Sequence, residues 1–254
     1  MLFDTHAHLD DERFDEDRDA VIAQCRQDGV DLILNAGSNM ETSVRSIALA
    51  GKYDFIYAAV GVHPHDASQM DQGTAGALAA LAENRKVRAI GEIGLDYHYD
   101  LSPRDVQQKR FIEQIDLARQ LKLPIIVHDR EAHGDVMDIF KKSRIKEVGG
   151  VLHSFSGSAE MAQECLRMGL YLSISGPVTF NNAKKTVEAV RDIPLDMLLI
   201  ETDSTYLTPV PHRGKRNYPG YVRFVAEKIA EIKGITFEEV ARKTMENGKR
   251  LFGI

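Results

Sequence analysis

The sequence predicts an α/β fold of the TIM-barrel class, (β/α)8, built as a single domain over residues 1–254. Eight short apolar runs recur along the whole chain, and amphipathic segments separate them. Strands that alternate with helices predict a parallel sheet, because parallel neighbours need a crossover connection. A length of 254 residues suits one barrel of about 250 residues. No Gly-rich phosphate-binding loop opens a helix, which disfavours an open nucleotide-binding sheet.

The eight apolar runs are rich in valine, isoleucine and other residues that favour strands. Short runs of this kind, without a strict alternation of polar residues, are typical of strands that a parallel sheet buries on both faces. We therefore expect eight parallel strands. Their predicted positions are residues 2–6, 30–37, 55–63, 87–94, 123–129, 149–155, 170–176 and 196–203.

Two of the intervening segments carry clear helix signals. Within residues 104–121, apolar side chains around Phe111 repeat at i, i+4 and i+7 with charged residues opposite, which is typical of an amphipathic helix. Within residues 236–252, Thr236 stands three residues before Glu239, the spacing of a capping box. No linker, low-complexity tract or repeat divides the chain, so we expect one domain.

Composition and charge exclude several classes of protein. The chain is 43% hydrophobic and 28% charged, and its net charge of -6 argues against nonspecific coating of nucleic acid, which needs clustered positive charge. No apolar stretch approaches the ~20 residues that cross a bilayer, and the acidic start argues against a secretory signal. Cys25 and Cys165 are expected to be buried thiols in a reducing compartment. We expect a cytoplasmic protein with no membrane contact and no obligate protein partner.

Ionisable residues gather where the predicted strands end. The carboxyl ends of barrel strands converge on one face, where active sites are built. Burying an unpaired charge there is costly, and metal coordination removes that cost. Each residue taken singly has a structural alternative, such as a strand cap, a salt bridge or a helix N-cap, but their joint occurrence points to a site. The residues are His6, His8, His63, His65, Glu92, His128, His153, Glu201 and Asp203.

The chemistry of this set predicts a binuclear metal centre. Four imidazoles and two carboxylates suit zinc, manganese or cobalt better than an all-oxygen magnesium site. Six ligands are too many for one catalytic ion with an open position, and they suit two ions about 3.5–4 Å apart that share a carboxylate. The predicted ligands are His6, His8, Glu92, His128, His153 and Asp203.

Two carboxylates are predicted to be catalytic as well as ligating. Glu92, from the middle of the barrel, is the natural bridge between the ions. Asp203 could ligate one ion and also accept a proton from the attacking water. Asp96, close behind Glu92, is expected to hydrogen-bond a ligand imidazole.

With these residues identified, the chain resembles the TatD-type metal-dependent hydrolases of the amidohydrolase superfamily. The matching stretches run from residue 4 to residue 252, so the resemblance covers essentially the whole chain. They are DTHAHLD, VGVHPH, IGEIGLDY, IIVHDR, HSFSGS, IETDS, YLTP, RGKRN and NGKRLF.

The resemblance implies a TIM barrel with two divalent ions, which could be Zn, Mn, Mg or Co. It places His6, His8, Glu92 and Asp203 around one ion, and Glu92, His128 and His153 around the other. Glu92 stands where many superfamily members have a carboxylated lysine, which favours the nuclease-like branch. The chain departs from the family at Thr205, where a proline is usual, and we expect this change to alter the loop behind Asp203.

The segment that follows the last ligand is predicted to meet the substrate. Residues 204–224 contain no acidic residue but several basic ones, and a local positive loop is well placed to bind phosphates. The alternative is an ordinary solvated loop. His63 and His65 could orient a phosphate or protonate a leaving oxygen, and a purely structural role is the alternative for His65. The predicted substrate-binding residues are His63, His65, Tyr206, Arg213, Lys215 and Asn217.

These features predict a divalent-metal-dependent hydrolase, with DNA as the expected substrate. The family includes deoxyribonucleases with 3′→5′ exonuclease activity. A local positive loop in a chain of net charge -6 favours short contacts with a single-stranded end over a long duplex footprint. The alternative is a D-aminoacyl-tRNA deacylase, or another ester or amide hydrolase, that uses the same metal centre. A relative that has lost catalysis is disfavoured, because every predicted ligand is present.

Overall fold

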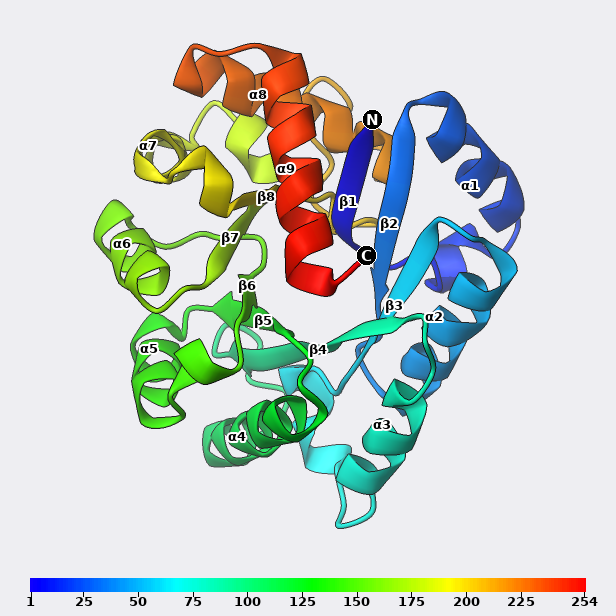
Figure 1. Cartoon of the computed structure of the whole chain (residues 1–254), viewed down its shortest axis with the longest axis vertical. Coiled ribbons are helices and arrows are strands. Elements are labelled where there is room, and N and C mark those ends of the chain that lie inside the picture. The colour runs from blue at the N-terminus through cyan, green and yellow to red at the C-terminus, as the bar shows by residue number, and fades with distance from the viewer. The chain divides into compact units, whose positions relative to one another are not determined.

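The computed structural model describes all 254 residues, and strands alternate with helices along the chain (Figure 1). The strands are β1 (Leu2–Ala7), β2 (Val30–Ala36), β3 (Ile56–Val60), β4 (Val87–Asp96), β5 (Ile125–Arg130), β6 (Gly150–Leu152), β7 (Tyr171–Ile174) and β8 (Leu198–Ile200). The helices are α1 (Arg18–Gln27), α2 (Met40–Lys52), α3 (Thr74–Ala82), α4 (Arg104–Leu121), α5 (His133–Lys142), α6 (Ala159–Arg167), α7 (Lys184–Asp192), α8 (Val222–Lys233) and α9 (Phe237–Phe252).

The strands form one sheet in the order β1-β2-β3-β4-β5-β6-β7-β8, and the strand pairs run parallel. This confirms the predicted (β/α)8 class. All eight predicted strands are found, but β3, β6, β7 and β8 are shorter than expected. The prediction extended the sixth strand to residue 155, whereas the chain turns after Leu152 and Ser154 has a φ of 43°. Left-handed backbone of this kind cannot continue a strand.

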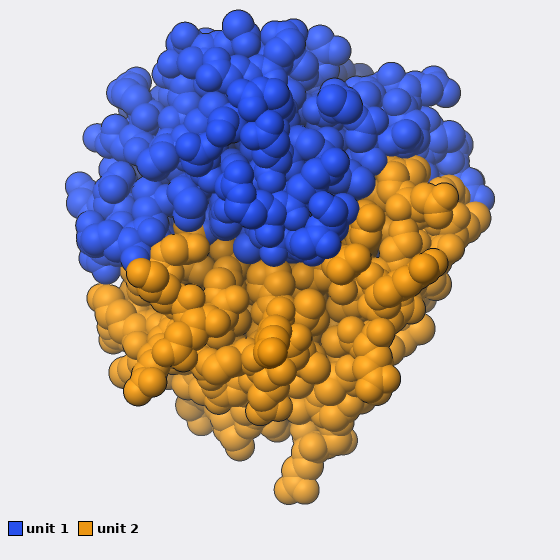
Figure 2. All heavy atoms as spheres, viewed as in Figure 1, with its two compact units in different colours: residues 1–35, 154–167, 171–254 blue, residues 36–153, 168–170 orange.

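The chain divides into two compact units, which Figure 2 distinguishes by colour. Unit 1 contains Met1–Asn35, Ser154–Arg167 and Tyr171–Ile254, and so carries β1, nearly all of β2, β7 and β8. Unit 2 contains Ala36–His153 and Met168–Leu170, and so carries β3 to β6. The prediction of a single domain over residues 1–254 stays a prediction.

In unit 1, helix α9 packs against β1 and β8 (Figure 1). The Phe3 and Phe252 rings meet edge to face, with centroids 6.0 Å apart. Gly248 faces the same ring, and a Cβ built there would lie 2.6 Å from Phe3 Cδ1. The absence of a side chain at Gly248 is therefore what lets α9 approach β1 this closely. At its other end, α9 begins as its sequence predicts, with the Thr236 hydroxyl accepting the backbone N–H of Glu239 at 3.2 Å.

In unit 2, helix α4 has the bounds that its periodicity predicts, and it also carries two buried glutamines. The Gln114 amide binds both backbone groups of Val62, accepting from N–H at 2.8 Å and donating to C=O at 3.0 Å. Gln107 binds the backbone N–H and C=O of Asp96 in the same way, at 2.8 and 3.1 Å. Buried backbone groups need such partners, so α4 fixes the chain at the ends of β3 and β4.

Two further expectations concern the cysteines and membrane contact. Cys25 and Cys165 are both buried free thiols, as predicted. Burial raises the pKa of the Cys25 thiol. None of the helices combines the length and the apolar character that crossing a membrane requires.

Candidate metal centre

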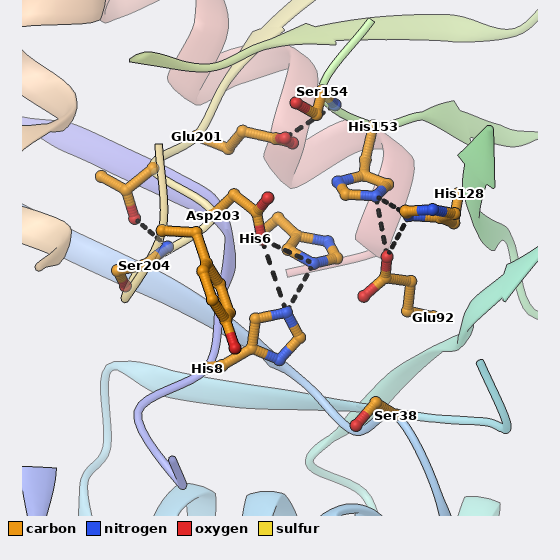
Figure 3. Close-up of polar contacts among 12 residues, drawn as sticks. His6, His8, Ser38, Glu92, His128, His153, Ser154, Glu201, Asp203 and Ser204 are labelled. Atoms are coloured by element: carbon orange, nitrogen blue, oxygen red, sulfur yellow. Dashed lines mark hydrogen bonds and ion pairs between the residues drawn. The ribbon is translucent and has the colours of Figure 1, made fainter. Parts of the chain in front are cut away.

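Unit 1 brings together three of the predicted ligands, His6, His8 and Asp203, which we call the first donor group. Figure 3 shows the two imidazoles and the carboxylate pointing toward one another. The Nε2 atoms of His6 and His8 lie 3.1 Å apart. Asp203 Oδ1 lies 3.8 Å from the first of these nitrogens and 3.6 Å from the second. Three ligand atoms that converge at these distances form a group that could hold a metal ion.

Backbone pairing between the end of β1 and the segment after β8 sets this geometry. The Asp203 N–H donates to His6 C=O, and the His8 N–H donates to Ser204 C=O, both at 2.9 Å. Asp203 has a φ of 53°, a left-handed conformation that is uncommon for a residue other than glycine. The Ser204–Thr205 peptide bond, one residue further along, is cis. Residues 203 and 204 thus lie beside residues 6 and 8 although most of the chain separates them.

A buried carboxylate supports the first donor group from within the barrel strand. Asp4 is fully buried, and it accepts hydrogen bonds from the Thr202 N–H at 2.9 Å and from the Thr202 hydroxyl. It also accepts the His6 N–H at 3.3 Å. Burial raises the pKa of Asp4 well above its usual value, and these hydrogen bonds oppose the rise. Asp4 therefore ties Thr202, the second residue before Ser204 and the neighbour of Asp203, to the backbone of His6.

Unit 2 brings together the other three predicted ligands around Glu92. Glu92 Oε1 lies 2.9 Å from His128 Nδ1 and 2.9 Å from His153 Nε2 (Figure 3). His63 Nε2 lies 3.5 Å from the same oxygen. We call His63, Glu92, His128 and His153 the second donor group. Glu92 is 4% exposed, so its carboxylate is held almost entirely among imidazoles.

His63 is predicted to bind substrate, and the structure places its Nε2 within the second donor group, 3.5 Å from Glu92 Oε1. Its Nδ1 accepts the His65 N–H at 3.2 Å, which directs Nε2 toward Glu92. Burial lowers the pKa of His63 to about 4, and the neutral imidazole is the form that binds metals. The repeated His-x-His pattern at residues 6–8 and 63–65 was the sequence signal for this role. A contact between His63 and substrate stays a prediction.

Asp96 makes the expected hydrogen bond to a ligand imidazole. Its Oδ2 lies 3.0 Å from His128 Nε2 and 2.9 Å from His65 Nε2. Burial raises the pKa of Asp96, but the hydrogen bonds from His128 and His65 outweigh burial and hold that pKa well below its usual value. Burial also lowers the pKa of His128, and here the Asp96 and Glu92 carboxylates outweigh it and raise that pKa. Such a carboxylate fixes the orientation of a ligating histidine.

The donor chemistry of both groups fits divalent metal ions. Imidazole nitrogens with one carboxylate in each group are the ligand types of zinc, manganese and cobalt.

Glu201, which also follows β8, is fully buried and accepts the Ser154 N–H at 2.7 Å (Figure 3). This bond holds the turn that directly follows His153. The bridging role predicted for Glu92 stays a prediction.

The loop after Asp203 contains the remaining predicted substrate residues. Tyr206 is exposed and the Arg13 guanidinium lies 4.2 Å from its ring centroid. Arg213 lies 3.9 Å from the centroid of Phe180, and Lys215 is exposed. These side chains reach solvent, and their contact with substrate stays a prediction.

Asn217 is the exception among the predicted substrate residues. It is fully buried, and its side-chain amide donates to Thr202 C=O at 2.9 Å and to Tyr206 C=O at 2.6 Å. Its side-chain oxygen accepts the Tyr218 N–H at 3.0 Å. The polar atoms of Asn217 are thus occupied within the loop, so the expectation of direct substrate contact is corrected. Asn217 braces the segment that carries Asp203.

Comparison with known proteins identifies the family. The family model described as TatD related DNase matches residues 3–253. The chain is 52% identical to the uncharacterized metal-dependent hydrolase YabD of Bacillus subtilis, with 100% of both chains covered. It is 38% identical to the 3′-5′ ssDNA/RNA exonuclease TatD of Cronobacter turicensis, with 99% of this chain and 97% of the relative covered.

A solved structure agrees with these matches. The crystal structure of YJJV, a TatD homologue from Escherichia coli, superposes with a TM-score of 0.94 at 32% sequence identity, covering 100% of this chain and 98% of that one. The family model, the sequence relatives and the solved structure therefore agree on the family. The chain belongs to the TatD related DNase family of metal-dependent hydrolases, enzymes that act on ester bonds.

Proposed function

We propose that the protein is a divalent-metal-dependent nuclease that cleaves phosphodiester bonds at the 3′ end of single-stranded DNA. The observation that carries the proposal is the grouping of His6, His8 and Asp203 in one cluster and of Glu92, His128 and His153 in another. A relative of the same family, 38% identical over nearly its whole length, is named a 3′-5′ ssDNA/RNA exonuclease.

Two divalent ions are proposed, one for each donor group. Each group offers at least two imidazoles and one carboxylate, which is enough to hold an ion while leaving positions for substrate and water. When bound, such ions supply Lewis acidity toward a phosphoryl oxygen. The chain's own residues then have to orient the substrate and move protons.

Asp203 is the proposed acceptor of the proton from the attacking water. Its side chain is 17% exposed, so one carboxylate can face His6 and His8 and still reach solvent. His65, with its side chain 29% exposed and its Nε2 held by Asp96, is the proposed group that steadies the phosphate or protonates the leaving oxygen. Asp96 would keep the His65 ring in one orientation during this step.

Metal removal and replacement, combined with two substitutions, tests the proposal. Metal-stripped protein is resupplied with magnesium, manganese, zinc or cobalt and given a single-stranded DNA labelled at its 5′ end. We expect stepwise shortening from the 3′ end with at least one metal. Asp203→Asn should lower turnover at least about 100-fold, because general-base catalysis contributes 10²–10⁴-fold, while metal content falls much less. Glu92→Ala should lower both.

Glu188→Gln, an exposed carboxylate of α7, is the matched control and should behave as the wild type. If no metal supports cleavage, or if Glu92→Ala cuts as fast as the wild type, the nuclease proposal is wrong. The same preparations are offered D-aminoacyl-tRNA, which tests the ester-hydrolase alternative directly. No contact in the structure favours that alternative, so it stays a prediction.

A further inference from the structure

An exposed aromatic side chain lies beside the second donor group and has no role in the chemistry proposed so far. Tyr99 follows β4, and it is 54% exposed. Its ring centroid is 5.5 Å from that of His65 and 4.8 Å from that of His98, at near-perpendicular angles of 83° and 80°. A large aromatic surface that stays open to solvent this close to candidate metal ligands needs an explanation.

A cation accompanies the ring. The guanidinium carbon of Arg130, the last residue of β5, lies 4.7 Å from the centroid of Tyr99. An arginine over an aromatic face gains a cation–π attraction and keeps its N–H groups for other partners. Asp96 and Arg130 are register partners in the β4–β5 ladder, so the two strand ends place ring and cation side by side.

The charge of Arg130 is not neutralised by the protein. The structure gives Arg130 no salt bridge, and the nearby carboxylates have other partners. Glu131 binds His98 at 2.8 Å, and Asp100 binds Arg104 at 2.6 Å. Arg13 also lies over an aromatic ring, that of Tyr206, but its charge is paired, because Asp11 binds it at 2.9 Å. Arg130 can therefore offer a bidentate contact to a phosphate.

The position of Tyr99 relative to the ligands is fixed by backbone hydrogen bonds. The Tyr99 N–H donates to Asp96 Oδ1 at 2.9 Å, while the other oxygen of the same carboxylate binds His65 and His128. The Tyr97 N–H donates to Arg130 C=O at 2.9 Å. The Asp96 carboxylate thus fixes the position of both the His128 imidazole and the Tyr99 backbone. A base stacked on the Tyr99 ring would therefore be held at a constant distance from the reacting phosphate.

We propose that Tyr99 and Arg130 form a nucleotide subsite, in which an unpaired base stacks on the Tyr99 ring and Arg130 binds the adjoining phosphate. The subsite rests on the proposed nuclease function and assigns two residues outside the donor groups to binding its single-stranded substrate. Bases stack on aromatic side chains only when they have left a helix, and stacking tolerates any base because every base has a π face. The subsite therefore selects single-stranded nucleic acid without selecting its sequence.

The test uses two single-stranded DNA oligonucleotides of equal length that differ only in their bases. One has normal nucleotides throughout, and the other has abasic tetrahydrofuran residues at its last three 3′ positions. The wild type should cleave the normal strand with a kcat/KM about 5- to 150-fold higher, the range that one stacked base supplies. Tyr99→Ala should lose this preference by slowing only on the normal strand, and Tyr99→Phe should keep it.

Arg130→Gln should lower kcat/KM on both strands, because the phosphates remain in the abasic strand. Two controls have matched chemistry. Leu101→Ala removes another exposed side chain of the same loop. Tyr57→Ala removes a ring that also lies under cations, Lys86 and Arg88, but stands near the amino end of β3. Both should keep the preference of the wild type.

The outcomes separate the subsite from the function on which it rests. Equal cleavage of both strands by the wild type, or an equal loss on both strands in Tyr99→Ala, overturns the subsite and leaves the nuclease function standing. Absence of cleavage of either strand with any metal overturns both.

Discussion

Asn217 shows how much one side chain can do for a loop that carries a functional residue. Its amide binds the carbonyls of Thr202 and Tyr206, one on each side of Asp203. Because Asp203 has a left-handed backbone, the loop needs external bonds to hold it there. A residue far along the chain thus determines where a candidate ligand points.

Asn217→Asp should weaken this loop and lower activity. The substitution keeps the shape of the side chain but removes both donors and buries a carboxylate beside two carbonyl oxygens. We expect a loss of about 1–3 kcal/mol in the free energy of unfolding, measured by urea denaturation, and a lower kcat with a smaller change in KM. Asn181→Asp, an exposed site, is the control. Unchanged stability and kcat in Asn217→Asp would show that the loop holds without this brace.

At the scale of elements, the contact between α9 and β1 depends on the absence of a side chain at Gly248. Alanine usually stabilises a helix by about 1 kcal/mol relative to glycine. A Cβ at Gly248 would lie 2.6 Å from a ring atom of Phe3 and 3.3 Å from Thr5 Cγ2, and the Phe3 ring is fully buried. Overpacking of this kind costs about 1–3 kcal/mol, which exceeds the helical gain.

Gly248→Ala should therefore destabilise the protein, by up to about 2 kcal/mol after the helical gain is subtracted. Gly76→Ala in α3 is the matched control, because a Cβ there meets nothing within 4 Å and should be neutral or stabilising. Thermal unfolding of both variants against the wild type measures the difference. If the two substitutions shift the melting temperature alike, the close packing of α9 on β1 is not what limits this position.

At the scale of the whole molecule, the donor groups link bound metal to folding. The first group joins residues 6 and 8 to residue 203, and the second joins residues 63 and 153 through Glu92. An unfolded chain does not hold these residues together, so metal bound to the native state adds stability by mass action.

Removing metal should lower the melting temperature of the wild type. At a free metal concentration of 100 times the dissociation constant, binding contributes about 2.7 kcal/mol, and chelation removes that amount. A double variant, Glu92→Ala with Asp203→Asn, should show a much smaller shift between metal-loaded and chelated samples. Differential scanning calorimetry with and without chelator measures both. Identical melting temperatures of wild type in the two conditions would contradict metal binding at these groups.

The sequence was sufficient for the fold class and for six of the seven side chains in the donor groups, all but His63. The reason is geometric, because the carboxyl ends of parallel strands share one edge, so Glu92 and His128 could be grouped from their strand positions alone. The bounds of α4 followed from its periodicity. These predictions depend on local pattern and on topology, which the order of residues carries directly.

Other features depended on contacts that local pattern does not contain. The shortening of β6 follows from the turn at Ser154, whose N–H is bound by Glu201 from a distant strand end. The burial of Asn217 goes with a hydrogen bond to Thr202, 15 residues earlier in the chain, and the exposed Tyr99 stands in a loop whose backbone is bound by the Asp96 side chain. Sequence reasoning could name residues near the site, but it could not say which of them face solvent.

The pairing of residues 6 and 8 with residue 203 also has a consequence for synthesis. On a ribosome the chain emerges from its amino end, and the residues of the second donor group, 63 to 153, are all made before Asp203. The first group cannot assemble until Asp203 has left the exit tunnel, and β1 cannot gain its packing partner α9 until residues 237–252 follow. A nascent chain that has completed the second donor group therefore still lacks the first one until Asp203 emerges.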